Sequence, residues 1–395
     1  MDPTVTLRGI TWGHTRGFVP MVATAQRYSE LHPGVRIQWE LRSLQAFADQ
    51  SIEALARSYD LLVIDHPSIG EAAAHGLFLP LDTHVPASFL EDQARHSVGQ
   101  SHPSYTHSGH AWALATDAAT PVSAARPDVL ARHGERIPDT WEELIALARR
   151  GLVAFAGLKL DCLMHWYTLC INEGAEPFTE RERIVAPEVG VAALQALREL
   201  VDACGPACRS RNPIAAYELL SSSDEHGYSP FAYGYSNYAR ASYAAHPLTF
   251  GPLVSRKGRR LRSTLGGAGL AVSAHCKSSA SAIDYACFVA SGEVQTGLYT
   301  AMGGQPGHRR AWLDDENNRI THGFFRGTLS TLDEAYLRPR YAGYITFQEQ
   351  APEVIARFLS GQLGATSAFA ELDALDAAHR KGVLDERHLQ QGGAR

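Results

Sequence analysis

A regular alternation of strand-like and helix-like segments near the start of the chain constrains the fold most. Residues 6–12 and 35–39 alternate between apolar and polar side chains and are rich in β-formers, which is typical of strands. Between them, apolar side chains in residues 18–28 recur at helical spacing, and His32-Pro33-Gly34 ends that helix. Residues 61–64 form a continuous apolar run, typical of a strand buried on both faces. Strands separated by helices form βαβ units, so the sequence predicts an α/β protein with a parallel sheet.

Size and charge exclude several classes of protein. The chain has 395 residues, which is long for one core and suits two lobes. No run of about 18 apolar residues is present, so we expect no insertion into a membrane. A net charge of -6 argues against a nucleic-acid partner, which normally meets a basic face. We expect the local basic run at 256–262 to be a solvated loop.

Three further patterns mark elements in the middle of the chain. Thr140 precedes a helix with apolar residues on one face, which predicts a capped helix start. Residues 111–115 favour a strand, and residues 266–269 favour a glycine-rich turn before a strand at 270–272.

Motifs for catalysis, metal binding and cofactor binding are not found in the sequence. We find no nucleophile elbow, zinc-protease helix or phosphate loop, so we expect no enzyme, no cofactor and no metal. His102, His107 and His110 lie on one loop without an acidic partner. Six cysteines do not frame a disulfide-rich protein. Cys204 and Cys208 could bridge in an oxidising compartment and would be ordinary thiols elsewhere.

Three segments, taken in order, carry a resemblance to a known family. The first runs from the helix at 18–31 to residues 59–65 and on to Gly76-Leu77-Phe78-Leu79-Pro80-Leu81-Asp82. The second is Trp112-Ala113-Leu114-Ala115-Thr116-Asp117, and the third joins 266–273 to Gly303-Gly304-Gln305-Pro306. With these segments the chain resembles the extracellular solute-binding proteins of ABC importers. It is similar in particular to the carbohydrate-binding family that includes maltose-binding protein.

The resemblance implies a type II periplasmic-binding-protein fold, with two hinged lobes and the ligand in the cleft between them. We expect lobe one to comprise 1–116 plus 266–310, and lobe two 117–265 plus 311–395. The implied protein is a monomer that captures a small polar ligand by lobe closure and hands it to an ABC permease. Sugars, polyols and sugar acids are the implied ligands.

Candidate ligand-binding residues follow from the rule that ligands of open α/β sheets lie at the carboxyl ends of the strands. Trp12 and His14 follow the first strand, and Asp65 and His66 follow the third. Ala268 stands where many relatives carry an aromatic residue. The full set is Trp12, His14, Asp65, His66, Asp117, Tyr233, Tyr235, Tyr238, Gly267 and Ala268.

Each of these residues also has an ordinary structural explanation. Trp12 suits a core, His14 and His66 suit a surface, and Asp117 suits a turn or helix cap. Arg16 suits either an anion partner or a surface helix end.

Location and the alternative function both depend on the start of the chain. Residues 1–4 have no basic start and no apolar segment follows, so we expect no export signal. The protein is then periplasmic or extracellular by family resemblance, as a mature form, or cytoplasmic if this start is native. A cytoplasmic sensor or enzyme on the same fold, similar to thiaminase I, is the alternative. Cys162 and Cys170 are the cysteines that such an enzyme would use.

Overall fold

The computed structural model describes residues 5–43, 51–180 and 182–392, with side chains up to residue 380. The chain divides into two compact units, which we describe separately. Unit 1 comprises residues 1–119, 235–237 and 265–333, and unit 2 comprises 120–234, 238–264 and 334–395. Unit 1 thus includes residues 117–119, 235–237, 265 and 311–333, which we expected in lobe two.

Unit 1 is built on a five-stranded sheet in the order β2-β1-β3-β12-β6. Strand β1 pairs in parallel with β2 over eight residues and with β3 at its centre, as the strand–helix alternation predicted. The strands are β1 (Val5–Trp12), β2 (Val35–Arg42), β3 (Leu61–Ile64), β6 (Leu114–Ala119) and β12 (Gly266–Val272).

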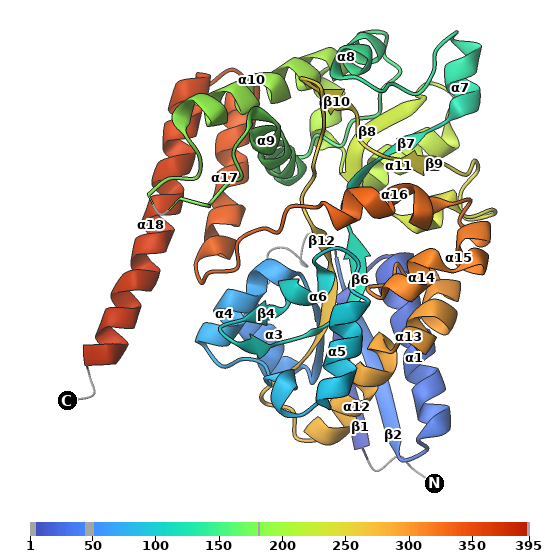
Figure 1. Cartoon of the computed structure of the whole chain (residues 1–395), viewed down its shortest axis with the longest axis vertical. Helices are drawn as coiled ribbons and strands as arrows, with labels where there is room; N and C mark the ends of the chain where they lie inside the picture. Colours follow the sequence, from blue (N-terminus) through green and yellow to red (C-terminus); the bar gives the residue numbers. More distant parts are fainter. Residues whose placement is uncertain (1–4, 44–50, 181, 393–395) are drawn as a thin grey trace. The chain divides into compact units, whose positions relative to one another are not determined.

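Strand β12 departs from the predicted parallel sheet. It runs antiparallel to both β3 and β6, and it lies between them (gold in Figure 1). Gly266 pairs with Ala119 at the end of β6, so β12 enters the sheet where β6 leaves it and must run in the opposite direction. The sheet is therefore mixed.

The glycines at 266–269 form part of this strand, so the predicted turn is wrong. Gly267 has φ +105°, and a Cβ there would overlap the Asp117 carbonyl oxygen. A Cβ on Gly269 would lie 2.6 Å from the Tyr105 ring. The register shifts between Ala268 and Gly269, which marks a bulge. The glycines are present because the neighbouring strand and ring approach too closely for side chains.

Helices cover both faces of the sheet in unit 1. Leu7, Met21, Tyr28, Leu270 and Tyr285 belong to a core that joins β1, α1, β12 and α12. A second cluster packs β3 and α4 against Tyr105 and Trp112. The elements outside the sheet are α1 (Thr15–Leu31), α3 (Ile52–Ser58), η1 (His66–Ser68), α4 (Ile69–Ala74), η2 (Leu81–Thr83), α5 (Ala87–Arg95), α6 (Ser101–Ser104), β4 (Thr106–His107), β5 (His110–Ala111), α12 (Ser279–Ala290), α13 (Gly292–Val294), η5 (Gln295–Tyr299), α14 (Arg309–Leu313), α15 (Asp315–Ile320) and α16 (Phe324–Asp333).

Unit 2 combines a three-stranded antiparallel sheet, in the order β8-β7-β9, with a helical layer. Its core joins α8, α9, α10, α17 and α18, with Trp166 and Tyr167 fully buried at the centre. Helix α8 begins with the predicted cap, since Thr140 and Glu143 form a capping box. The elements are β7 (Pro121–Ala125), α7 (Pro127–Arg132), α8 (Trp141–Arg149), α9 (Lys159–Glu173), α10 (Pro187–Cys204), η3 (Pro206–Ser210), α11 (Pro213–Ser222), β8 (Tyr228–Tyr233), β9 (Thr249–Gly251), β10 (Ser255–Arg256), β11 (Arg259–Arg260), α17 (Tyr344–Leu359) and α18 (Ala365–Gly392).

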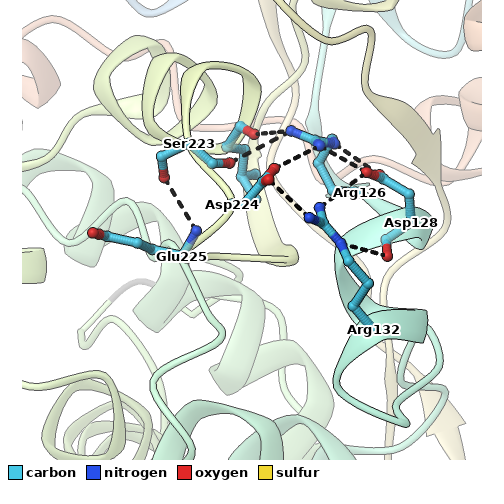
Figure 2. A network of polar contacts seen from close by, with 7 residues as sticks. Arg126, Asp128, Arg132, Ser223, Asp224 and Glu225 are labelled. Atoms are coloured by element: carbon cyan, nitrogen blue, oxygen red, sulfur yellow. Dashed lines mark hydrogen bonds and ion pairs between the residues drawn. The ribbon is translucent and has the colours of Figure 1, made fainter.

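A buried arginine holds the end of α11 in unit 2 (Figure 2). Arg126 donates to the Leu220 carbonyl at 3.1 Å, at the carboxyl-terminal end of α11. Its guanidinium also contacts Asp128 at 2.7 Å and Asp224 at 3.0 Å, and Arg132 joins both carboxylates from outside. The hydrogen bond from Arg126 lowers the pKa of Asp128 to about 2. The network satisfies a helix end that would otherwise leave carbonyl groups without donors.

The basic run at 256–262 is a short hairpin rather than a loop, and its residues 257–260 are exposed to solvent as predicted. Strands β10 and β11 are joined by Lys257 and Gly258, both with positive φ, as a two-residue hairpin turn requires. Arg256 and Lys257 contact Glu173 at 2.5 and 2.6 Å, and Arg260 contacts Asp139 at 2.7 Å. These carboxylates hold the run against unit 2.

Among the described residues, no helix combines the length and the apolar character that crossing a membrane requires.

Candidate functional site

The carboxyl ends of β1, β3 and β6 lie at one edge of the unit 1 sheet, because these three strands point the same way. Each of these three strands has a residue of the predicted ligand-binding set, either just after its end or within it. His14 comes two residues after β1, Asp65 comes directly after β3, and Asp117 is the fourth of the six residues of β6. This edge is where a ligand of an α/β sheet is expected.

A buried ion pair between Arg16 and Asp117 forms the centre of this edge. The Arg16 side chain is 5% exposed and the Asp117 side chain 1%. Arg16 Nε donates to Asp117 Oδ2 at 2.8 Å, and its Nη2 donates to Oδ1, so the contact is bidentate. Burial raises the pKa of Asp117, and Arg16 opposes that rise. Burial lowers the pKa of Arg16, but the contact with Asp117 raises it, and the pKa of Arg16 is raised overall. The sequence left Arg16 open; the structure places it inside the site.

The Tyr235 ring, itself only 6% exposed, covers the Arg16 guanidinium, and the His14 ring packs against Tyr235. The Tyr235 ring lies 4.8 Å from the Arg16 Cζ, in cation–π geometry. The His14 ring meets Tyr235 edge-on at 4.6 Å, and His14 Nδ1 accepts from the Arg16 backbone N–H as the N-cap of α1. Burial, with Arg16 nearby, lowers the pKa of His14 to about 4. His14 is therefore neutral at neutral pH, with its Nδ1 acting as an acceptor.

The residues after Tyr235 fix its position in unit 1. The Ser236 backbone N–H donates to Gln305 Oε1 at 3.0 Å, and Gln305 Nε2 donates to the Ala118 carbonyl at 2.8 Å. Asn237 Nδ2 donates to the Gly303 carbonyl at 3.2 Å. The short segment 235–237 is thereby held against β6 and against the Gly303–Gln305 stretch.

Asp65 and His66 also lie at this edge, and they differ in exposure to solvent. The Asp65 side chain is 31% exposed, caps η1 through the His66 N–H at 2.9 Å, and lies 3.1 Å from His66 Nδ1. The His66 side chain is fully buried. Asp65 is therefore a member of the predicted set that keeps an accessible carboxylate at this edge.

Three predicted residues lie in the framework of unit 1. Trp12 is 5% exposed and belongs to the core, where its ring leaves no room for a side chain at Gly17. Ala268 is buried in the same cluster, and Gly267 makes the close approach to Asp117 described above. Ligand contact by these three residues stays a prediction.

Tyr233 and Tyr238 belong to unit 2 and have different surroundings. Tyr238 is buried, donates to Glu218 Oε1 at 2.6 Å and packs against the rings of Tyr217 and Tyr243. Tyr233 ends β8 half-buried, with its hydroxyl 2.9 Å from Thr264 Oγ1. Of the two, Tyr233 has the more accessible ring.

Asp161 is a candidate in unit 2 that the sequence analysis missed. It is the third residue of α9, and burial raises the pKa of its carboxyl to about 8. One turn later, His165 places Nε2 2.9 Å from the Ala156 carbonyl and packs against the rings of Phe155 and Phe231. A buried carboxyl that burial keeps neutral can both donate and accept hydrogen bonds, and perturbed groups of this kind gather at functional sites. The only sequence signal was an acidic residue near the start of an otherwise apolar helix.

The cysteines named for the alternative enzyme are poor nucleophiles. Cys162 and Cys170 are fully buried, and burial raises the pKa of both thiols well above the ordinary value. Nucleophilic cysteines need a thiolate and access, and both thiols lack these. Cys204 and Cys208 are also free thiols.

The arrangement in unit 1 is chemically suited to holding a polar molecule. It offers an accessible carboxylate, a neutral imidazole and an aromatic ring on a fixed cation, all positioned by strand ends and helix caps. Such groups give orientation through hydrogen bonds and contact area through the ring.

The chain matches one family of known proteins over most of its length. Residues 23–316 match the family model described as bacterial extracellular solute-binding protein. Among curated protein sequences, no relative matches the chain. The structure is similar to maltose-bound MalE3 of T. maritima, with a TM-score of 0.83 and 18% identity over 96% of this chain and 100% of that one.

Two further solved structures are similar over nearly the whole chain. A solute-binding protein from Agrobacterium radiobacter K84, in complex with ribitol, has a TM-score of 0.81 and 17% identity, covering 95% of this chain and all of that one. Another from Thermotoga lettingae, bound with α-D-tagatose, has a TM-score of 0.80 and 15% identity, covering 96% and 100%. These likenesses confirm the predicted two-lobe α/β fold of periplasmic solute-binding proteins. Since the family model covers most of the chain, the chain belongs to the bacterial extracellular solute-binding protein family.

Proposed function

We propose that the protein is the substrate-binding component of an ABC importer and that it captures a small sugar or polyol. Membership of the solute-binding family supports the general role. Solved structures of the same fold contain maltose, ribitol and tagatose, which supports the ligand class. Its partners would be the ligand and an ABC permease, and it would act outside the cytoplasmic membrane as a monomer.

The main support for an uncharged ligand is that Arg16, the cation beneath the Tyr235 ring, is already neutralised by Asp117. Arg16 is already paired with Asp117, so the site does not need an anionic ligand to balance its charge. Asp65 adds an accessible carboxylate, which accepts hydroxyl donors and disfavours an acid. An uncharged polyhydroxylated ligand therefore fits better than a sugar acid.

Asp65, His14 and Tyr235 would contact the ligand in unit 1. Asp65 would accept from hydroxyl groups, His14 would use its neutral imidazole, and the small accessible part of Tyr235, which is 6% exposed, would contact an apolar sugar face. Tyr233 and Asp161 are the proposed contributions of unit 2, since one offers a ring and the other a carboxyl kept neutral by burial. Other predicted residues would support the site structurally without touching the ligand: Trp12, His66, Tyr238, Gly267 and Ala268.

Calorimetry with a panel of ligands tests the proposal. The panel would contain maltose, ribitol, tagatose and, as a sugar acid, gluconate. We expect at least one neutral ligand to bind, and Asp65→Asn to weaken that binding by about tenfold, because a carboxylate–hydroxyl bond contributes about 1.5 kcal/mol. Glu316→Gln is the matched control, since Glu316 is an exposed carboxylate on α15 paired with Arg319. Preference for gluconate would contradict the ligand class.

The same experiment separates a receptor from an enzyme. After incubation, mass spectrometry of the recovered ligand should give the original mass. A changed ligand would overturn the receptor function, and the rate with Asp161→Asn would then identify the acid.

A further inference from the structure

Three metal-ligating side chains come together in unit 1, away from the residues proposed for the ligand. Asp92 lies near the end of α5, His96 is the C-cap of that helix, and His308 precedes α14. One ligand atom from each of these residues lies within 4.8 Å of the others, in the one such group of three among the described residues. The sequence had drawn attention to other histidines, at 102, 107 and 110.

The Asp92 carboxylate lies between the two imidazoles, and His96 Nδ1 is also 3.0 Å from the Asp92 backbone carbonyl. Asp92 Oδ1 lies 3.0 Å from His96 Nδ1, and Oδ2 lies 3.2 Å from His308 Nε2. The two rings face each other at 4.8 Å with an interplanar angle of 20°. Asp92 and His96 are at i and i+4, so the end of the helix puts them on one face.

The backbone holds the third ligand in place. Ser97 and His308 form an antiparallel bridge, and the Arg309 N–H donates to the His96 carbonyl at 2.7 Å. A Cβ on Gly292 would lie 2.9 Å from the His308 ring, so the glycine leaves room for it. The side chain of His308 is 1% exposed, whereas those of His96 and Asp92 are 20% and 33% exposed. The group is thus anchored on one side and open to water on the other.

We propose that Asp92, His96 and His308 bind a divalent transition-metal ion, with zinc as the best match. Two imidazoles and one carboxylate are a ligand set that zinc accepts, and water would take the fourth position on the open side. Zinc bonds of about 2.0–2.2 Å require ligand atoms about 3.4 Å apart, so ligand atoms that now lie up to 4.8 Å apart must approach by up to about 1.4 Å. The partly exposed side chains of Asp92 and His96 can make that movement.

Two groups of Arg310, its guanidinium and its backbone N–H, affect metal binding by this group. Arg310 Nη2 lies 3.7 Å from Asp92 Oδ1 and repels a cation there. The Arg310 N–H donates to His308 Nδ1 at a long 3.4 Å. Binding through His308 Nε2 moves the ring proton to Nδ1, so the metal replaces this weak cap. The ion would then join the end of α5 to the start of α14 as a structural link in unit 1.

Zinc titration of the full, untagged chain tests the site. After treatment with a chelator, we expect calorimetry to give one zinc ion per chain and a rise in the melting temperature with zinc. Cobalt should give a visible absorption band typical of a four-coordinate site. His96→Gln and Asp92→Asn should each weaken zinc binding by at least about tenfold.

Two variants make the test specific. His75→Gln is the matched control, because His75 pairs with Glu71 at the same i,i+4 spacing, at 3.3 Å, outside the group of three. It should leave zinc binding unchanged. Arg310→Gln should tighten binding severalfold, since it removes the repelling charge.

The results separate a metal site from a hydrogen-bonded network. Absence of zinc binding in the parent chain, or binding that His96→Gln and Asp92→Asn leave intact, would overturn the proposal. Thermal melts of the variants without zinc show whether they fold, so a loss of zinc binding is assigned only to folded protein. Failure of this site would leave the sugar-binding proposal intact, since the two use different residues and different probes.

Discussion

The Asp161 carboxyl illustrates how burial alone sets the state of a residue. Its pKa is raised to about 8 in the folded chain, against about 3.9 in the unfolded chain. A raised folded pKa gives stability that is fully present below pH 4 and is lost as the pH rises through about 8. We expect Asp161→Asn to abolish this loss, so that the variant gains up to about 5 kcal/mol relative to the parent between pH 4 and 8. Urea unfolding across that range measures it.

Asp202→Asn is the control for this pH dependence, because Asp202 is exposed on α10. Its unfolding free energy should follow the parent at every pH. If Asp161→Asn also followed the parent, the Asp161 carboxyl would be ionised in the folded protein.

The Arg16–Asp117 pair gives a second prediction at the residue scale. Removing one partner leaves the other charge buried, so Arg16→Met and Asp117→Asn should each cost about 3–5 kcal/mol of unfolding free energy. The double variant should cost much less than the sum, because no lone charge remains. Urea unfolding of the four proteins completes the cycle. Additive costs would mean that the two groups act independently.

At the scale of elements, Arg126 and Arg132 offer a matched pair (Figure 2). Both contact Asp128 and Asp224, but the Arg126 side chain is 2% exposed and that of Arg132 is 53% exposed. Arg126→Met should destabilise unit 2 by about 2–4 kcal/mol, because carbonyl groups at the end of α11 lose their donor. Arg132→Met should cost under about 1 kcal/mol. Equal costs, measured by thermal and urea unfolding, would show that helix capping contributes nothing.

The local hydrophobic pattern of the sequence predicted many helices and strands correctly. It gave wrong predictions where segments far apart in the sequence pack together. The alternation of strands and helices gave β1, α1, β2 and β3, because each signal lies within one short stretch. The direction of β12 depends on where the chain returns to the sheet, which no local pattern contains. The glycines of β12 looked like a turn because their cause, the close approach of Asp117 and Tyr105, lies more than a hundred residues away in the sequence.

The same limit explains which members of the candidate site could be proposed from the sequence. His14 and Asp65 were proposed because they lie within two residues of the end of a strand. Arg16 was left open because its partner Asp117 is 101 residues away. Asp161 was missed because its signal is burial, which the sequence does not state.

At the scale of the whole molecule, capture of ligand by lobe closure stays a prediction with its own measurement. Two units joined by short chain crossings can move as hinged bodies, and a ligand that contacts both favours the closed form. Small-angle scattering should give a smaller radius of gyration with ligand than without it. The control is the same ligand added to a variant that calorimetry shows not to bind. Tight binding without compaction would contradict closure.

The central place of β12 in the sheet has a consequence for biosynthesis. Strand β3 ends at Ile64, but its neighbour β12 begins only at Gly266, so roughly 200 residues of translation separate them. At about 5–20 residues per second, the ribosome needs about 10–40 s to supply the missing strand. Until then β3 and β6 each have an edge without its native partner, and such edges attract other chains. The nascent chain would therefore depend on a chaperone for longer than a protein whose sheet is completed in sequence order.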